Sequence, residues 1–373
     1  MGKCMKKIVV SAINFTGGGP LSILKECLEY LSNELAGSYE IIALVNDKRF
    51  FEYRNITYYS FPKSKKSWLA RLYYEYIYFY GFSKKLNPHL WLSLHDITPN
   101  VKSDMRAVYC HNASPFYVLS FKDVYLGGCK FTLFNYFYRY LYNINIKKNN
   151  FVIVQQDWFR KKMEQLIEKG KIIVAYPNID LKKLISAVPD TENIIYYPAL
   201  PRVFKNFEVI CRAAEILIKQ GIYNFQVVFT MLGTENRYAK YIYKHFKHIN
   251  NVKFVGIQSR DRVFELMNRV SCVVFPSKLE TWGLPITEAK LFMKPVILAD
   301  LEYAHETLGT YDKAKYFNPD DPEQLAAIMK DVINKTVVYD KTKARDIAYP
   351  FAQNWKELFN ILLKQEGKHP QDK

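Results

Sequence analysis

Two carboxylates frame the start of a predicted helix in the second half of the chain. Glu280 lies in the loop that follows the apolar residues 272–275, and Glu288 lies about one turn into the helix that begins near Gly283. Both side chains can therefore face one crevice at the carboxyl end of a strand, where carboxylates commonly accept hydrogen bonds from sugar or ribose hydroxyls. The alternative is that both are helix-start charges favoured by the helix dipole, and the two interpretations stay open at this point.

The same helix start has the features of an anion site. Pro285 stands near the first turn, where its missing N–H is tolerated, and Gly283 lets a ligand approach the backbone because it has no side chain. The free N–H groups of a helix start and its positive dipole end favour a negatively charged ligand. The pattern therefore predicts that a phosphate fits here.

Alternating strands and helices must position these residues. Short apolar runs alternate with amphipathic patterns along the 373 residues, which indicates an α/β fold with parallel sheets and crossover helices. The predicted strands cover residues 8–13, 41–45, 90–94, 107–110, 151–154 and 172–175 in the first half, and 194–197, 226–230, 252–255, 272–275 and 296–298 in the second. Clear helical patterns cover residues 21–35, 68–82 and 157–168.

The length of the chain allows two domains of ordinary size. Residues 176–193 contain Pro177, Pro189 and Asn193 and have the turn-rich composition of a linker. We therefore expect one domain over residues 1–180, a second over residues 181–350, and a C-terminal helix with a polar tail over residues 351–373. The amphipathic residues 352–364 could pack on either domain.

Residues 276–289, PSKLETWGLPITEA, resemble the donor-site motif of retaining family 4 glycosyltransferases, which belong to the glycosyl transferases group 1 and have the GT-B fold. The resemblance implies two Rossmann-like domains that face each other across a cleft, with the acceptor on the N-terminal side and the nucleotide-sugar donor on the C-terminal side. It also implies that Glu280 contacts hydroxyls of the transferred sugar and that Glu288 holds the ribose. The backbone amides of Gly283 and Leu284 would bind the diphosphate.

The resemblance extends through most of the second half. Gly256 and Ile257 would lie beside the nucleobase, although Gly256 is also explained as a strand-end turn. Lys205 matches the family's phosphate-binding lysine. The family's arginine does not align, because its spacing points near residues 199–200 and the available cation is Arg202. Arg202 either reaches the diphosphate from a different position or is a surface charge.

The first half carries less specific features. Gly18 and Gly19, in a run of three glycines after the opening strand, resemble the family's glycine loop; alone they could equally suggest a dinucleotide fold, but the pattern Gly-x-Gly-x-x-Gly fails. His111 ends a predicted strand and resembles the family's histidine near the reacting sugar, while a strand-end histidine is also commonly structural. His95 and Asp96 end another strand and are weaker candidates for acceptor contact.

The formal net charge of +17 and the many aromatic residues suit a partner that is anionic lipid, phosphate or nucleic acid. Residues 63–85 and 130–148 are both aromatic and basic: they either lie at a lipid interface or supply core aromatics beneath solvated lysines. No stretch approaches the roughly 20 apolar residues that cross a bilayer. Six scattered cysteines suit free thiols in a reducing cytoplasm. We expect a cytoplasmic protein, peripheral at the inner face of the cell membrane.

These features predict a retaining glycosyltransferase that moves a sugar from a UDP- or GDP-sugar to a glycan or lipid-linked acceptor, by resemblance in bacterial surface polysaccharide or lipopolysaccharide assembly. His111, Glu280 and Lys205 are the expected catalytic residues, with Arg202 and the helix amides assisting the leaving phosphate. No Asp-x-Asp motif serves the site, so we expect no metal and no other cofactor.

Two other functions stay open. One is a non-catalytic, basic membrane-binding adaptor with a degenerate transferase fold. The other is a sugar-nucleotide epimerase or phosphorylase on the same architecture, since a fold does not fix a reaction. Nucleic acid is not an expected partner, because no recognisable reader motif is present and the aromatics cluster at helical spacing.

Overall fold

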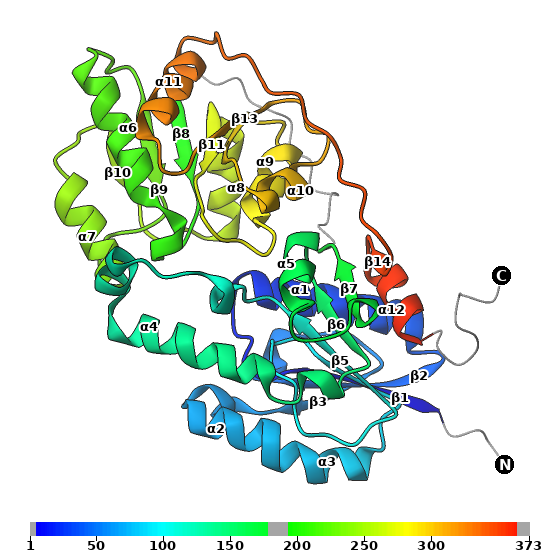
Figure 1. The fold of residues 1–373 in the computed structure, drawn as a ribbon. Coiled ribbons are helices and arrows are strands. Elements are labelled where there is room, and N and C mark those ends of the chain that lie inside the picture. Colours follow the sequence, from blue (N-terminus) through cyan, green and yellow to red (C-terminus); the bar gives the residue numbers. More distant parts are fainter. Residues whose placement is uncertain (1–4, 178–192, 364–373) are drawn as a thin grey trace. The chain divides into compact units, whose positions relative to one another are not determined.

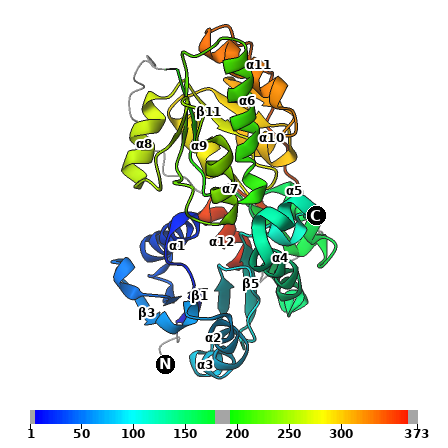
Figure 2. The ribbon, with the colours of Figure 1, turned by 90° about the vertical axis from the view of Figure 1, so that its left-hand side faces the viewer.

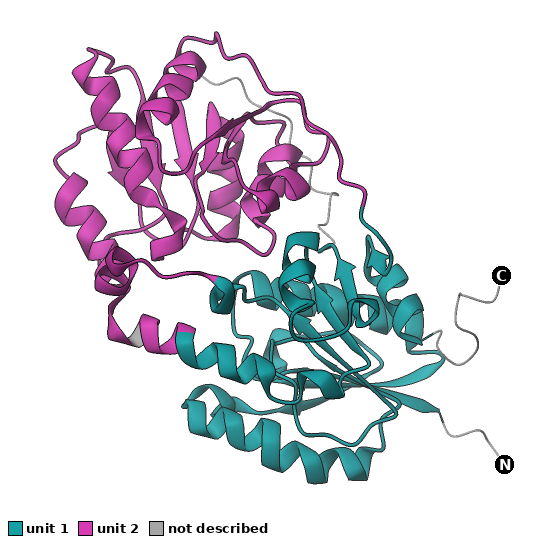
Figure 3. Ribbon diagram, in the orientation of Figure 1, with its two compact units in different colours: residues 1–116, 136–178, 347–373 teal, residues 117–135, 179–346 magenta. Residues whose placement is uncertain are grey.

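The computed structural model describes residues 5–177 and 193–363, which belong to two compact units (Figure 3). Unit 1 comprises residues 1–116, 136–178 and 347–373, and unit 2 comprises residues 117–135 and 179–346. This division differs from the expected domains in two places: residues 117–135 group with unit 2, and the C-terminal helix groups with unit 1. The expected boundary near residue 180 and the polar tail lie outside the described residues.

A parallel sheet forms the centre of unit 1 (Figure 1). In the described residues its strand order is β14-β7-β6-β5-β4-β1-β2-β3. The strands are β1 (Lys6–Ala12), β2 (Tyr39–Val45), β3 (Ile56–Ser60), β4 (Leu90–Ser93), β5 (Met105–Cys110), β6 (Phe151–Val154), β7 (Ile172–Ala175) and β14 (Phe351–Ala352). The chain builds outward from β1 through β2 and β3, then continues with β4 on the other side of β1. The switch point of this sheet therefore lies between β1 and β4.

Helices cover both faces of this sheet, as its nearly continuous apolar strands require. Side chains alternate along β1, so that Ile8 and Val10 pack with α1 and α12 in one core, whereas Val9 packs with Phe79 of α3 in the other. The α-helices are α1 (Gly18–Tyr30), α2 (Trp68–Tyr73), α3 (Phe79–Leu86), α5 (Asp157–Met163) and α12 (Trp355–Leu363), and α4 (Phe121–Asn143) begins in unit 2 and ends in unit 1. The π-helical turns Leu31–Leu35 and Tyr74–Tyr78 follow α1 and α2.

The C-terminal helix α12 packs on unit 1. Of the two domains on which the amphipathic residues 352–364 could pack, it is therefore the first. Phe359 stacks on Tyr30 of α1 with ring centroids 5.6 Å apart, and Trp355 lies 6.1 Å from Tyr109 of β5. The short strand β14 adds to β7 in front of this helix. Unit 1 is thus completed by residues that follow unit 2 in the chain.

Unit 2 has its own parallel sheet, with the order β10-β9-β8-β11-β12-β13 among the described residues. The strands are β8 (Ile194–Tyr197), β9 (Gln226–Phe229), β10 (Val252–Phe254), β11 (Cys272–Phe275), β12 (Val296–Ala299) and β13 (Ala314–Phe317). The helices are α6 (Phe207–Lys219), α7 (Arg237–Phe246), α8 (Arg260–Arg269), α9 (Leu284–Leu291), α10 (Glu302–Leu308) and α11 (Pro322–Ile333). Helices α6 and α11 lie side by side (Figures 1 and 2). The switch point lies between β8 and β11.

The predicted α/β class is confirmed, and each predicted strand coincides with an observed strand to within a few residues. Strands β3, β13 and β14 were not predicted; β3 is largely exposed and β14 has only two residues, so neither has a continuous apolar run. The predicted helix over residues 68–82 is instead α2 and α3 joined by a π-helical turn, and α5 ends at Met163, earlier than expected.

Candidate functional site

Two loops meet at the switch point of unit 2, one after β8 and one after β11. The carbonyl oxygen of Phe204, in the first loop, accepts hydrogen bonds from the backbone N–H of Lys278 at 2.7 Å and from the Ser277 hydroxyl at 3.3 Å. Asn206, which ends the first loop, donates its side-chain amide to the carbonyl oxygen of Pro276 in the second loop at 3.4 Å, and to that of Pro319, after β13, at 2.7 Å. These bonds hold both loops at one edge of the sheet, the edge at which ligands bind in folds of this type.

An ion pair between Lys205 and Glu280 links the same two loops. The two side chains are 17% and 12% exposed, so the pair is partly shielded from water. The Lys205 ammonium also lies 5.4 Å from the ring centroid of Phe275, at the end of β11, and the Tyr197 hydroxyl donates to the Lys205 carbonyl oxygen at 3.0 Å. A ligand that carries both phosphate and hydroxyl groups would meet a cation and a carboxylate side by side.

Gly283 allows α9 to begin against the end of β11. Its φ of +86° lies in the left-handed region, and a Cβ at this position would lie 3.0 Å from Cδ1 of Ile286 and 3.3 Å from Cε1 of Phe275. Both constraints require glycine. The helix starts at Leu284, which is half-buried, and no side chain caps its N-terminus. Pro285 has no N–H group, and the Ile286 N–H donates to the Gly283 carbonyl oxygen at 2.9 Å, so anion binding by the amides of Gly283 and Leu284 stays a prediction.

Glu288 lies in the second turn of α9 and is 5% exposed. One of its oxygens lies 2.9 Å from the guanidinium of Arg260, which begins α8 and is 58% exposed. Burial raises the pKa of Glu288, and the Arg260 charge opposes this rise. Because water reaches Arg260, the buried carboxylate can exchange this partner for the hydroxyls of a ligand.

Gly256 and Ile257 follow β10 and stand just before α8. Gly256 has a φ of +78°, and a Cβ there would lie 3.1 Å from the Leu232 side chain, so this turn requires glycine. Ile257 is 68% exposed. Arg260, which follows this turn, contacts Glu288, and the nucleobase role of Gly256 and Ile257 stays a prediction.

Arg202 stands immediately before the short 3₁₀ turn Val203–Lys205 and is exposed. Its side chain makes no hydrogen bond or ion pair with the described parts of the chain. Both of its predicted roles, phosphate contact and surface charge, therefore stay predictions.

Gly18 and Gly19 begin α1 at the switch point of unit 1. Gly18 has a φ of +67°, which favours glycine, but the nearest atom to a Cβ there would be Cδ of Pro20 at 3.9 Å. The requirement at Gly18 is therefore conformational and not steric. The helix N-terminus has no side-chain cap, as at α9.

His111 follows β5 and is half-buried between aromatic rings. It stacks on Tyr109 with centroids 4.4 Å apart, and Phe15 meets it edge-on at 5.7 Å. Burial lowers the pKa of His111 to about 4 despite the opposing charge of Asp96, so the imidazole is neutral at physiological pH. His95, by contrast, is fully buried, and its ring is not accessible to an acceptor in this conformation.

Comparison with known proteins places the second half of the chain in a family. Residues 178–349 match the model of the family described as glycosyl transferases group 1. These residues form a group 1 glycosyltransferase domain. The match confirms the resemblance drawn from residues 276–289, while the narrower assignment to retaining family 4 stays a prediction.

Solved structures of glycosyltransferases are similar to this chain in fold. A lipopolysaccharide outer core galactosyltransferase, WaaB, superposes with a TM-score of 0.63 and 13% identity, over 97% of this chain and 100% of that chain. HepE from Anabaena, in complex with UDP-glucose, superposes with a TM-score of 0.62 and 16% identity, over 88% and 90% of the two chains. These similarities confirm the GT-B fold, with its two parallel sheets.

A curated relative is the serotype-specific mannosyltransferase WbdA of Escherichia coli, which is 25% identical over 111 residues. The aligned region is 30% of this chain and only 13% of that protein. The match therefore concerns one segment of a much longer relative.

The group 1 domain also uses residues that sequence reasoning missed. Arg260 was not singled out, although an arginine just after the Gly256–Ile257 turn was a usable signal. Residues 117–135, which lie outside the family match, pack beside the Lys205 loop: Lys122 pairs with Glu208 at 2.8 Å. Tyr117 and Phe131 also contact the Phe204 ring, at 5.9 and 6.5 Å. These contacts could not be predicted, because residues 117–135 are far in the sequence from Phe204 and Glu208.

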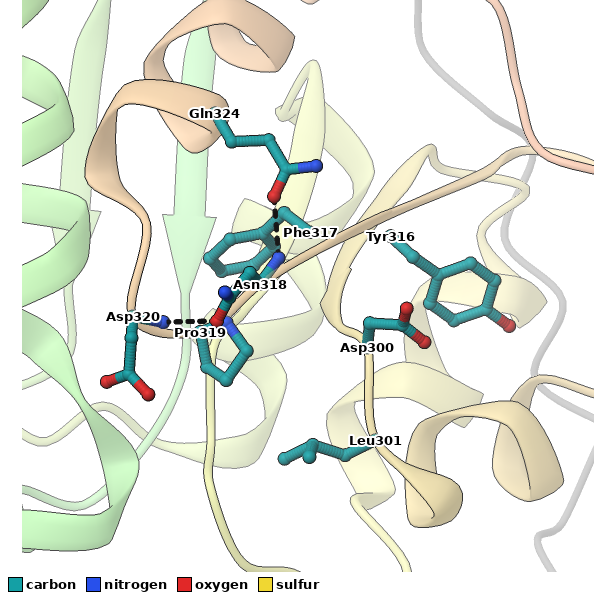
Figure 4. A pocket seen from close by; sticks show the side chains of 8 residues that line it. All are labelled: Asp300, Leu301, Tyr316, Phe317, Asn318, Pro319, Asp320 and Gln324. Atoms are coloured by element: carbon teal, nitrogen blue, oxygen red, sulfur yellow. Dashed lines mark hydrogen bonds between the residues drawn. The ribbon is translucent and has the colours of Figure 1, made fainter.

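A hollow of about 460 Å³ lies at the carboxyl ends of β12 and β13 (Figure 4). Its lining is largely polar and consists of Asp300, Leu301, Tyr316, Phe317, Asn318, Pro319, Asp320 and Gln324. Gln324 accepts a hydrogen bond from the Asn318 N–H at 2.7 Å, so the rim is internally braced. None of the predicted donor residues lines this hollow, although Lys278 of the β11 loop pairs with Asp320.

Proposed function

We propose that the protein is a retaining glycosyltransferase that transfers a sugar from a UDP- or GDP-sugar to a glycan or lipid-linked acceptor. The observation that carries this proposal is the Lys205–Glu280 ion pair beside the uncapped start of α9, at the switch point of a group 1 glycosyltransferase domain. The similar HepE structure is a complex with UDP-glucose, which supports a nucleotide-sugar donor for this fold.

In the proposed complex, Glu288 accepts the ribose hydroxyls, and the amides of Gly283 and Leu284 meet the diphosphate. Lys205 turns from Glu280 towards a phosphate oxygen, and Arg202 adds a second positive charge. Glu280 then accepts hydrogen bonds from hydroxyls of the sugar. The exchange is favourable because each charged group trades one ionic or hydrogen-bonding partner for another and none is left buried and unpaired.

In the proposed reaction the acceptor hydroxyl attacks the anomeric carbon on the face from which the nucleoside diphosphate leaves. The bond from this carbon to the acceptor oxygen forms, and its bond to the phosphate oxygen breaks. The leaving phosphate takes the acceptor's proton, and Lys205, Arg202 and the α9 amides stabilise its charge. His111 is neutral and contacts the sugar through its ring or backbone. We propose that no metal or other cofactor takes part.

We further propose a role in bacterial surface polysaccharide or lipopolysaccharide assembly, at the inner face of the cell membrane. The names of the similar galactosyltransferase and mannosyltransferase support the first part. None of the helices in residues 5–177 and 193–363 is both long and apolar enough to cross a bilayer. The attachment that we propose is therefore peripheral, through a surface of unit 1.

An aromatic and basic surface of unit 1, formed by α2, the π-helical turn and α3, supports membrane attachment. Leu69, Tyr73 and Ile77 are 79%, 50% and 65% exposed on these elements. Lysines flank them at positions 63, 65, 66, 84 and 85. Other aromatics of the same stretch, such as Phe79, are core residues, so both interpretations of the stretch apply to different side chains. Apolar side chains ringed by lysines suit an anionic lipid surface.

The function is tested by incubating the full-length protein with UDP-glucose, UDP-galactose and GDP-mannose. We expect at least one donor to raise the melting temperature and to release nucleoside diphosphate. A flat response to all UDP and GDP donors would favour the adaptor. Isomerisation of the nucleotide sugar without release of nucleoside diphosphate would favour an epimerase, and phosphate-dependent release of a sugar phosphate would favour a phosphorylase.

A further inference from the structure

Asp96 is the most densely bonded carboxylate at the switch point of unit 1. It follows β4 and is 9% exposed. Its Oδ1 accepts hydrogen bonds from the backbone N–H groups of His111 at 2.6 Å and Asn112 at 3.0 Å, and from the Tyr142 hydroxyl at 3.0 Å. Its Oδ2 accepts a bond from the Tyr138 hydroxyl at 3.0 Å. One side chain thus joins β4, the loop after β5, and α4.

Two consecutive N–H groups on one carboxylate oxygen fix the direction of a peptide. These N–H groups belong to the peptides that carry the chain away from β5, and the Tyr142 hydroxyl, whose single proton is shared between two acceptors, also lies 2.7 Å from the Asn112 carbonyl oxygen of the next peptide. The imidazole of His111 then stacks on Tyr109. Hydrogen bonds to an ionised acceptor are roughly twice as strong as neutral ones, so the carboxylate is well suited to this task.

The chain accepts strain to place this carboxylate. Asp96 has a φ of +68°, in the left-handed region that favours glycine. The buried Arg71 guanidinium donates to the His95 carbonyl oxygen at 2.8 Å, one residue before Asp96. Strain that the surrounding structure maintains is commonly found at functional sites.

We propose that Asp96 is a positioning residue of the transfer reaction, acting through the backbone of His111 and Asn112. The inference rests on the proposed function, in which His111 contacts the sugar that is transferred. This role differs from the acceptor contact expected from the sequence, because Asp96 acts here through the peptides that it binds. Its carboxylate sets where the His111 ring and peptide stand, and transfer slows when a group that touches the reacting sugar is misplaced by a fraction of an ångström.

The test compares Asp96→Asn with wild type, using the nucleotide sugar of the panel that gives most nucleoside diphosphate. The amide keeps the shape and one acceptor oxygen but removes the charge. We expect kcat to fall by about 10- to 100-fold while the donor KM stays within about twofold, as for a lost positioning contact. Tyr142→Phe removes the hydroxyl that contacts both Asp96 Oδ1 and the Asn112 carbonyl oxygen, but keeps the two N–H bonds to Asp96, and should lower kcat by a smaller factor.

Asp104→Asn is the matched control, because Asp104 precedes β5, is 72% exposed and pairs with His89 at 3.1 Å. It should leave kcat unchanged. A wild-type kcat in Asp96→Asn overturns the inference and leaves the proposed function standing, as does a donor KM that rises as much as kcat falls. Absence of turnover in the wild type with every donor overturns both together.

Discussion

Each of the two sheets has a switch point, but the polar side chains at the two switch points differ in their exposure to solvent. At the switch point of unit 2, the charged side chains are within reach of a ligand: Arg260, the partner of Glu288, is 58% exposed. At the switch point of unit 1, His95 and Glu75 lie 3.3 Å apart with both side chains 0% exposed; burial lowers the pKa of His95 and raises the pKa of Glu75, so both side chains are neutral near pH 7. Both sites lie at carboxyl ends of parallel strands, where doubly wound folds bind ligands.

This difference indicates different tasks. In the ion pairs of Lys205 and Glu288 one partner of each pair stays accessible to a ligand, because the Lys205 and Arg260 side chains are 17% and 58% exposed. A buried polar cluster cannot exchange its partners with a ligand, because each group would be left unpaired in a low-dielectric environment. We infer that the unit 2 switch point binds by exchange of partners, and that the cluster in unit 1 fixes the shape of the loops around it.

Replacing Lys205 should have the largest effect. Lys205→Met removes the cation that we place on the leaving phosphate, and loss of one such group typically lowers kcat by about 10²- to 10³-fold. The measurement is the initial rate of nucleoside diphosphate release with the active donor, together with the melting temperature.

The matched control for Lys205 is Lys278→Met. Lys278 belongs to the partner loop, is 31% exposed and pairs with Asp320, away from Glu280. It should keep most of the activity. If Lys205→Met and Lys278→Met lost equal activity, the Lys205–Glu280 pair would have no special role compared with the surface pair of Lys278.

The buried cluster of unit 1, which contains Glu75, His95 and Arg71, should affect how the stability of the protein depends on pH. Burial raises the pKa of Glu75 to about 8, against the opposing charge of Arg71, so the folded protein keeps a proton that the unfolded chain releases at lower pH. This contribution to stability is complete below the unfolded pKa near 4.5 and is lost as the pH rises towards 8. Glu75→Gln removes the titration. From pH 5 to pH 8 the melting temperature of wild type should therefore fall relative to that of Glu75→Gln. The difference should correspond to about 2–5 kcal/mol in the free energy of unfolding.

Glu40→Gln serves as the control for Glu75, because Glu40 lies on β2 of the same sheet and is 45% exposed. Its melting temperature should run parallel to that of wild type over the same pH range. If Glu75→Gln also runs parallel, Glu75 keeps its charge in the fold and the cluster is not sealed as described.

Lipid binding should depend on exposed apolar side chains of unit 1 and not on those of unit 2, and this effect should be smaller than the previous ones. Ile77→Ser, on the aromatic surface of unit 1, should weaken flotation with anionic liposomes by about 3- to 10-fold, the cost of losing one partly buried aliphatic side chain. Val338→Ser, at a 75% exposed position of unit 2, should not. Loss of wild-type flotation at high salt would identify the lysine contribution, and absence of flotation at low salt contradicts the attachment.

The sequence could indicate a candidate site in unit 2 because the residues concerned lie close together in the chain. Residues 276–289 contain a strand end, a loop, a glycine with a positive φ and a helix start, so spacing alone places Glu280, Gly283 and Glu288. The sheets were predicted equally well, because buried parallel strands are continuous apolar runs. Arg260 escaped notice, because its pairing with Glu288 depends on how α8 lies against α9.

The unit 1 cluster could not be assembled from spacing. Asp96 and His111 were noticed separately as strand ends, but Tyr138 and Tyr142 stand in an aromatic helix in which many residues have the same composition. Glu75 sits in a π-helical turn within a pattern that fits an ordinary helix. Segments far apart in the chain converge here, and only tertiary packing selects which of their polar residues meet.

The most direct test of the account is the affinity of the active nucleotide sugar for wild type and for Glu288→Ala, measured by calorimetry. Glu302→Ala is the matched control, because Glu302 begins the next helix after a strand, α10, and pairs with Arg345 at 3.3 Å. We predict that Glu288→Ala weakens donor binding by about 100-fold or more, as expected for loss of a buried charged hydrogen-bond acceptor, and that Glu302→Ala binds as wild type. Unchanged donor affinity and turnover in a folded Glu288→Ala protein would contradict the placement of the donor at the unit 2 switch point.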